Sequence, residues 1–174
     1  MSIYIALIRA LNVGGTGLLA MEELRQICVG LGLTSVATYI QSGNVIFRTE
    51  EPATDVALRL DVALGERLGK APGVFLRRPD ELTDVLNHNP FRDLEPNRVL
   101  VSFFGEPLPD DALSGLVAPD GEQAVLGGRE IYVHYPLGSG RSKFKLPALK
   151  AGTSRNINTV AKLAELGHAL ETTA

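Results

Sequence analysis

The order of apolar segments in the first half of the chain limits its fold more than any other feature. Residues 3–8 are apolar at almost every position, which predicts a strand buried on both faces. Apolar residues with i, i+3, i+4 spacing over residues 20–31 and again over 53–68 predict two amphipathic helices. Three shorter segments predict the remaining strands, at residues 36–41, 44–48 and 73–77.

The resulting order in the first half is βαββαβ, the split βαβ arrangement of ferredoxin-like (alpha-beta plait) domains. The second half is predicted to begin βαββα, with no closing strand visible in the sequence. Its predicted elements are helices at 79–86, 110–116, 143–150 and 157–166 and strands at 98–104, 123–126 and 130–135. We therefore expect an α+β protein built as a tandem of two ferredoxin-like units, residues 1–78 and 79–174, the second incomplete or decorated with extra C-terminal helices.

Composition narrows the class of protein. The 174 residues are 45% hydrophobic and 21% charged, which is typical of a globular chain and excludes intrinsic disorder. No apolar run reaches the roughly 18 residues of a membrane helix, and the N-terminus lacks the basic segment of a signal peptide. The lone Cys28 excludes a disulfide framework, and its place on an apolar helix face predicts a buried structural thiol. We expect a cytoplasmic protein with no membrane association.

Charge is distributed unevenly along the chain. The net charge is −3, yet residues 131–164 carry six basic residues and no acidic one. A basic segment in an acidic chain is a candidate anion site, and a solvated basic surface is the alternative. The overall acidity argues against non-specific DNA binding.

The stretch at 153–163 is the most informative part of that basic segment. Ser154 or Asn156 is suited to cap a helix, and Ile157 and Val160 would face inward. Two cations, an amide and a hydroxyl then share the outer face, beside the free N–H groups of a helix start, as in phosphate sites. These are Arg155, Asn158, Thr159 and Lys162, and a capped, solvated helix face is the alternative.

Two other polar clusters lie in the first half. One follows the first strand and contains Arg9, Asn12, Gly14 and Gly15. Arg9 needs a salt-bridge or carbonyl partner within the protein, or else an anionic ligand. The other is the hairpin tip at residues 41–44, which is either simple turn chemistry or a recognition tip. With the two central strands taken as parallel, these clusters are expected at opposite ends of the sheet.

Residue constellations for chemistry are mostly missing from the sequence. The three histidines, His88, His134 and His168, have no metal-binding spacing, and no acid/base pair or nucleophile stands out. The aromatic signature of RNA-recognition sheets is also missing. We expect no metal and no cofactor, and leave open whether the protein is an enzyme.

Four segments in combination resemble the DUF1697 family of bacterial proteins of unknown function. They are Tyr4–Gly15, Met21–Arg25, Tyr39–Val45 and Thr153–Leu163. The resemblance implies a tandem of two ferredoxin-like units in a small cytoplasmic bacterial protein, and no activity. Two departures are Ala10, where the family usually has Gly, and Ile157, where it often has Trp; the second weakens a nucleobase interpretation.

These observations favour binding of a phosphate-bearing ligand, a nucleotide or a nucleic-acid segment, through the basic C-terminal helix start. The alternatives are an enzyme acting on a small anionic metabolite and an interaction module without chemistry. The oligomeric state stays open. The candidate ligand-binding residues are Arg9, Asn12, Gly14, Gly15, Gln41, Ser42, Asn44, Lys143, Arg155, Asn156, Asn158, Thr159 and Lys162.

Overall fold

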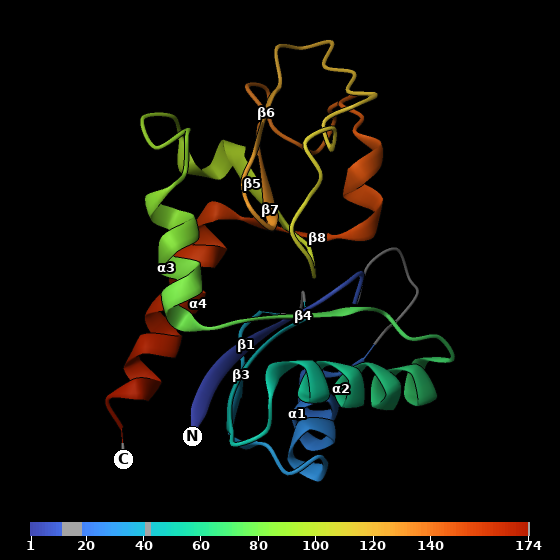
Figure 1. Cartoon of the computed structure of the whole chain (residues 1–174), viewed down its shortest axis with the longest axis vertical. Coiled ribbons are helices and arrows are strands. Elements are labelled where there is room, and N and C mark those ends of the chain that lie inside the picture. The colour runs from blue at the N-terminus through green and yellow to red at the C-terminus, as the bar shows by residue number, and fades with distance from the viewer. Residues whose placement is uncertain (12–18, 41–42, 174) are drawn as a thin grey trace. The chain divides into compact units, whose positions relative to one another are not determined.

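The computed structural model describes residues 1–11, 19–40 and 43–173. Over these residues the chain is a mixed α+β protein with two four-stranded antiparallel sheets and four α-helices. It divides into two compact units, shown in Figure 1. The first contains Met1–Leu82 and Leu163–Ala174, and the second contains Thr83–Lys162.

The first unit contains the elements expected from the sequence. They are β1 (Ser2–Ile8), α1 (Met21–Gly30), β2 (Thr34–Thr38), β3 (Asn44–Thr49), α2 (Ala53–Leu68) and β4 (Val74–Arg77). The strands stand in the order β2-β3-β1-β4, so β1 has a partner on each side, and both pairings are antiparallel. This central position explains why residues 5–8 of β1 are fully buried and why its sequence is apolar on both alternating faces.

One face of this sheet packs against α1 and α2, as Figure 1 shows. The alternate residues Ala6 and Ile8 of β1, with Val45 and Phe47 of β3, point into this core. They meet the apolar stripes of the helices, among them Leu24, Cys28, Leu60 and Leu64. Cys28 is fully buried as predicted, and desolvation raises the pKa of its thiol to about 12.

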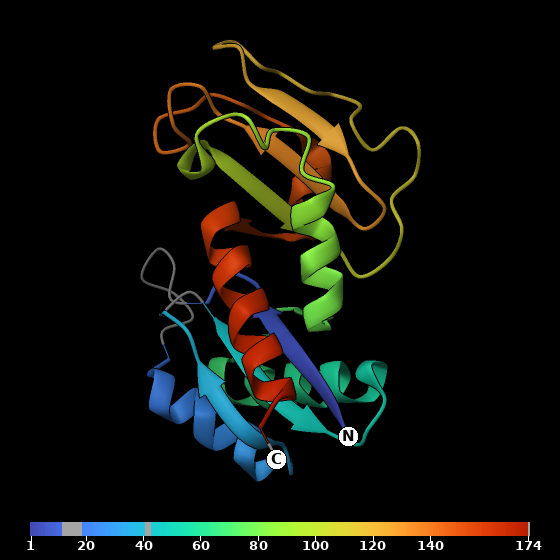
Figure 2. The same cartoon turned by 90° about the vertical axis from the view of Figure 1, so that its left-hand side faces the viewer.

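The other face of the sheet is covered by the C-terminal part of α4 (Ile157–Glu171), which Figure 2 shows running across the strands. A Cβ added at Gly167 would lie 2.8 Å from Pro79 Cγ and 3.1 Å from Ile5 Cδ1. Gly167 therefore lets the helix approach both β1 and the start of α3 (Pro79–Asn87). Ile5, Leu7 and Ile46 on this face are buried as well.

The second unit contains β5 (Val99–Phe103), β6 (Gln123–Leu126), β7 (Glu130–His134) and β8 (Thr153–Asn156), with 3-10 helices at Pro96–Arg98 and Pro147–Ala151. Its sheet has the order β6-β7-β5-β8, with β5 between two antiparallel partners. The buried Tyr132 hydroxyl donates a hydrogen bond of 2.7 Å to the carbonyl oxygen of Val85 in α3. That contact fixes α3 against the sheet on the Tyr132 side.

Two predicted helices of the second half are wrong. Residues 110–115 form turns and Leu116 is not helical either; Gly115, between Pro109 and Pro119, is in the left-handed region (φ +80°). Residues 143–146 are not helical; Lys145 forms a bridge with Val117, and the 3-10 helix Pro147–Ala151 follows. Pro147 has no N–H to donate, so it cannot lie inside an α-helix but fits a helical first turn.

The closing strand that the sequence did not reveal is β8, which pairs with β5 from Leu100↔Asn156 to Phe103↔Thr153. It is short and polar, Thr-Ser-Arg-Asn, and so lacks the apolar alternation that marks a strand. After β8 the chain returns to the first unit. Residues 163–174 belong to the first unit, whereas the sequence placed the whole C-terminal helix in the second half.

In the part of the chain with described coordinates, no helix is both long enough and apolar enough to cross a lipid bilayer.

Core burial on α2 gives a direct stability test. Leu60 is fully buried between α2 and the sheet, whereas Leu58 on the same helix is 65% exposed. We expect Leu60→Ala to lower the free energy of unfolding by about 2–5 kcal/mol, through lost burial and a residual cavity. Leu58→Ala, the control, should stay within about 0.5 kcal/mol of the parent chain. Urea denaturation followed by circular dichroism compares the two, and equal losses would contradict this packing.

Candidate anion site at one end of the first sheet

The end of β1 lies beside the beginning of β3. Leu7 pairs with Asn44, and the Ile8 N–H donates to the Gly43 carbonyl oxygen at 2.9 Å. The expectation that the 9–15 and 41–44 clusters lie at opposite ends of the sheet is therefore wrong. It took the two central strands as parallel, whereas β1 and β3 are antiparallel, so one strand ends where the other starts.

The same end of the sheet receives a third loop. Ile8 pairs with Val74 at the start of β4, and the Arg9 N–H donates to the Gly73 carbonyl oxygen at 3.0 Å. The loop between α2 and β4 is held in place by Asp61, whose carboxylate accepts a 2.8 Å hydrogen bond from the Gly73 N–H. The segments after β1, before β3 and before β4 thus meet at one edge.

Two of the three described non-glycine residues with a left-handed φ lie at this edge; the third is Ser35 (φ +50°) in β2. Ala10 (φ +54°) and Ile40 (φ +50°) are non-glycine residues in the left-handed region, close to Gly43 (φ +83°) and Gly73 (φ +95°). Such a conformation is uncommon for alanine and an outlier for a β-branched residue such as isoleucine. Strain of this kind costs on the order of 1–3 kcal/mol and clusters at functional sites.

A cavity of about 380 Å³ opens at this edge. Its polar lining is cationic, because it contains Arg9 and Lys70 and none of the described residues that line it is acidic. Both side chains are exposed, and the methylene groups of Arg9 lie over Gly73. The Lys70 ammonium makes no hydrogen bond or ion pair with any described residue. We call it the Arg9–Lys70 cavity; Ala10, Leu11, Leu68, Ala71 and Pro72 complete its wall. Two cations without a carboxylate favour an anionic occupant.

Several predicted site residues fall on or beside this edge. Arg9 lines the cavity, but it is exposed rather than buried at the strand end as the sequence suggested. Asn44 is fully buried and donates from Nδ2 to the Tyr39 carbonyl oxygen at 3.1 Å, so it holds the hairpin closed. The other predicted residues here lie outside the described part of the chain; they are Asn12, Gly14, Gly15, Gln41 and Ser42.

The prediction that Arg155 projects with Lys162 from a helix start is wrong. Arg155 belongs to strand β8 and is only 7% exposed. Its Nη1 donates to Thr153 Oγ1 at 2.7 Å and to the Ser154 carbonyl oxygen at 2.9 Å, and burial lowers the pKa of its guanidinium to about 10. Because the helix begins two residues later, at Ile157, the pair on which the predicted C-terminal anion site depends is not formed.

The remaining predicted residues of that segment have separate positions. Asn156 does cap the helix, since its Oδ1 accepts a 2.8 Å bond from the Asn158 N–H, while its Nδ2 donates to the Asn97 carbonyl oxygen. On α4, Asn158 is exposed, and Thr159 and Lys162 are half-buried. Lys143 is exposed on the loop before the 3-10 helix.

Sequence reasoning missed Lys70, the second cation of the cavity. It lies in the segment Gly69-Lys70-Ala71-Pro72-Gly73, which reads as an ordinary loop between α2 and β4. The antiparallel pairing of β1 with β4 places this loop beside Arg9, because β4 begins where β1 ends. Among the described residues, no cluster of histidine, cysteine and carboxylate side chains could hold a metal ion.

Comparison with known proteins identifies the family. Residues 1–132 match the family described as "Protein of unknown function (DUF1697)", and the chain therefore belongs to that family. The match includes the Arg9–Lys70 cavity and ends before β8 and α4. No curated protein matches the chain.

The chain is also similar to a solved structure, described as that of the conserved bacterial protein SP0830 from Streptococcus pneumoniae. The two sequences are 25% identical, and the TM-score is 0.78. The similarity covers 95% of this chain and 98% of the other. It therefore includes both units.

The contact between the first two loops can be tested at Gly43. A Cβ there would lie 3.0 Å from the Ile8 carbonyl oxygen and 3.1 Å from Leu11 Cβ, whereas one at Gly69 would meet nothing within 4 Å. Both glycines have a left-handed φ, +83° and +89°. Gly69→Ala should cost about 1–2 kcal/mol from backbone strain alone, and Gly43→Ala about 1–3 kcal/mol more from crowding. Denaturation curves measure the difference, and equal costs would refute the close approach.

Arg155 is expected to be a structural residue. Arg155→Ala removes a buried guanidinium that bonds to Thr153 and Ser154, so we expect the free energy of unfolding to fall by about 1–3 kcal/mol. The exposed Lys143→Ala should change it by less than about 0.5 kcal/mol. Thermal and urea unfolding report both values, and an Arg155→Ala chain as stable as its parent would contradict the burial.

Proposed function

We propose that this protein binds a small phosphate-bearing molecule in the Arg9–Lys70 cavity. The proposal depends on one observation: a guanidinium and an ammonium that has no partner among the described residues line the same cavity, whose described lining has no carboxylate. A phosphate monoester carries up to two negative charges and three acceptor oxygens, which suits two neighbouring cations. The proposed site therefore lies at one end of the first sheet and not at the start of the C-terminal helix, where the sequence predicted it.

The cavity favours a nucleotide-sized ligand over a nucleic acid. About 380 Å³ is within the range of small-molecule pockets, and the wall contains the apolar Leu11, Leu68 and Pro72, against which a non-phosphate part can lie. A nucleic acid would need an extended basic track, and the chain as a whole is acidic. Among the described lining residues, Arg9 and Lys70 are the only titratable groups, so no side chain there favours an enzyme over a binding protein.

We further propose that both units follow the ferredoxin-like plan. In each sheet the strands stand in the same relative order, second-third-first-fourth. In the second unit the connection from β5 to β6 contains turns and that from β7 to β8 a 3-10 helix, where the first unit has α1 and α2. A bacterial, cytoplasmic protein is part of this proposal; the likeness to a streptococcal protein and the lone buried thiol support it.

Titration calorimetry with adenosine 5′-monophosphate and with inorganic phosphate tests the proposed function. We expect saturable binding that weakens between about 50 and about 200 mM salt, because exposed charges are screened. Arg9→Ala with Lys70→Ala should weaken binding at least about tenfold, since two charge-assisted contacts are lost.

The matched control is Lys143→Ala with Lys145→Ala, which removes the same net charge from two exposed side chains of the second unit. It should leave the dissociation constant within about twofold. If the control variant lost as much affinity as the cavity variant, or if only a short oligonucleotide bound, the proposed site would be wrong.

A further inference from the structure

A second cavity, of about 640 Å³, lies at the opposite end of β1, within the first unit. Its lining comes from the start of β1, from β3, from the start of α3 and from the end of α4. We call it the Arg78–Glu171 cavity. Its lining residues are Met1, Ser2, Ile3, Arg48, Arg78, Pro79, Asp80, Glu171 and Thr173.

The charge of this cavity differs from that of the Arg9–Lys70 cavity. The charged side chains of its lining are two guanidiniums, of Arg48 and Arg78, and two carboxylates, of Asp80 and Glu171, so their charges balance. A purely anionic ligand would meet as much repulsion as attraction here. A ligand with one positive and one negative group can pair with both kinds of side chain.

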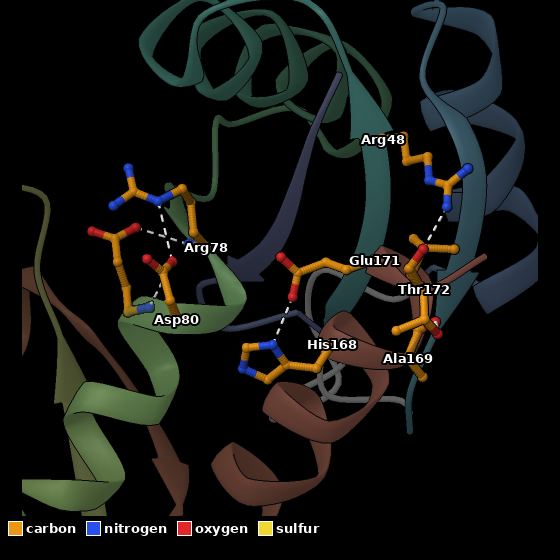
Figure 3. Close-up of polar contacts among 9 residues, drawn as sticks. Arg48, Arg78, Asp80, His168, Ala169, Glu171 and Thr172 are labelled. Atoms are coloured by element: carbon orange, nitrogen blue, oxygen red, sulfur yellow. Dashed lines mark hydrogen bonds and ion pairs between the residues drawn. The ribbon is translucent and has the colours of Figure 1, made fainter. Parts of the chain in front are cut away.

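Several of these charged side chains already bond to other residues of the protein, as Figure 3 shows. Arg48 Nη2 donates to the carbonyl oxygens of Leu170 and Thr173 and to Thr173 Oγ1, so Arg48 anchors the C-terminal end of α4. Arg78 Nε donates to Asp80 Oδ1 at 3.2 Å, and one oxygen of Glu171 contacts His168 Nδ1 at 2.6 Å.

Two charged ends remain open. Among the described residues, neither Nη atom of Arg78 has a hydrogen-bond partner, and the second carboxylate oxygen of Glu171 has none. The Arg78 side chain is 53% exposed and that of Glu171 48% exposed, so ligand atoms can reach both. The planar fork of Arg78 suits a carboxylate, and the free oxygen of Glu171 suits an ammonium group.

We propose that the Arg78–Glu171 cavity binds a short zwitterionic peptide of dipeptide size with an aliphatic side chain. Its C-terminal carboxylate pairs with the open side of Arg78, and its N-terminal ammonium pairs with Glu171. Ile3 and Pro79 supply an apolar surface for the side chain between them. About 640 Å³ accommodates a dipeptide and is within the range of small-ligand pockets. The site is independent of the Arg9–Lys70 cavity, so either proposal can fail alone.

Three matched probes test this assignment in titration calorimetry on the full chain. Leucyl-glycine carries both charges, N-acetyl-leucyl-glycine lacks the ammonium, and leucyl-glycinamide lacks the carboxylate. We expect leucyl-glycine to bind in the millimolar range, since both contacts are partly solvated, and each derivative to bind at least about fivefold more weakly. Absence of saturable binding, or equal affinity for all three probes, would overturn the proposal.

Variants locate the site. Arg78→Gln and Glu171→Gln should each weaken leucyl-glycine binding at least about fivefold and abolish discrimination against the derivative that lacks the corresponding charge. The control is Arg25→Gln with Glu22→Gln, which removes another exposed ion pair of the same unit, joined at 2.7 Å. It should bind leucyl-glycine as the parent chain does. Binding that survives Arg78→Gln but is lost with Arg9→Ala would assign the peptide to the other cavity and refute the proposal.

Discussion

The antiparallel pairing of β1 with both β3 and β4 is the constraint on which the rest of the first unit depends. It buries residues 5–8 of β1 completely, and so requires that part of the strand to be apolar on both faces. It also determines which loops of the first unit lie close together. The end of β1 adjoins the start of β3 and of β4, so three loops distant in sequence meet at one edge. The hydrogen bonds Ile8 N–Gly43 O and Arg9 N–Gly73 O are the direct expression of that arrangement.

The two ends of β1 carry different chemistry. At its C-terminal end the Arg9–Lys70 cavity has cations and no described acidic lining residue, with strained backbone at Ala10 and Ile40 beside it. At its N-terminal end the Arg78–Glu171 cavity has balanced charge, and Arg48 is occupied with the end of α4. The first end is therefore suited to an anion, and the second to a ligand that carries both charges.

The helix α4 begins in the second unit, and its residues from Leu163 onward belong to the first. Gly167 allows it to approach Ile5 and Pro79, and Arg48 binds the carbonyl groups near its end. It covers the face of the first sheet that carries Ile5. Both proposed ligand sites of this unit are cavities at the two ends of β1.

The sequence by itself determined the element order of the first unit, because hydrophobic periodicity identifies β1, α1 and α2 directly. It also determined the burial of Cys28 and the membership of a family. It could not show β8, since Thr-Ser-Arg-Asn has no apolar alternation and becomes a strand only through pairing with β5. For the same reason Arg155 could not be recognised as buried. Only the tertiary structure brought Lys70 to Arg9, because strand direction in a sheet is set by long-range pairing and leaves no local signal in the residues themselves.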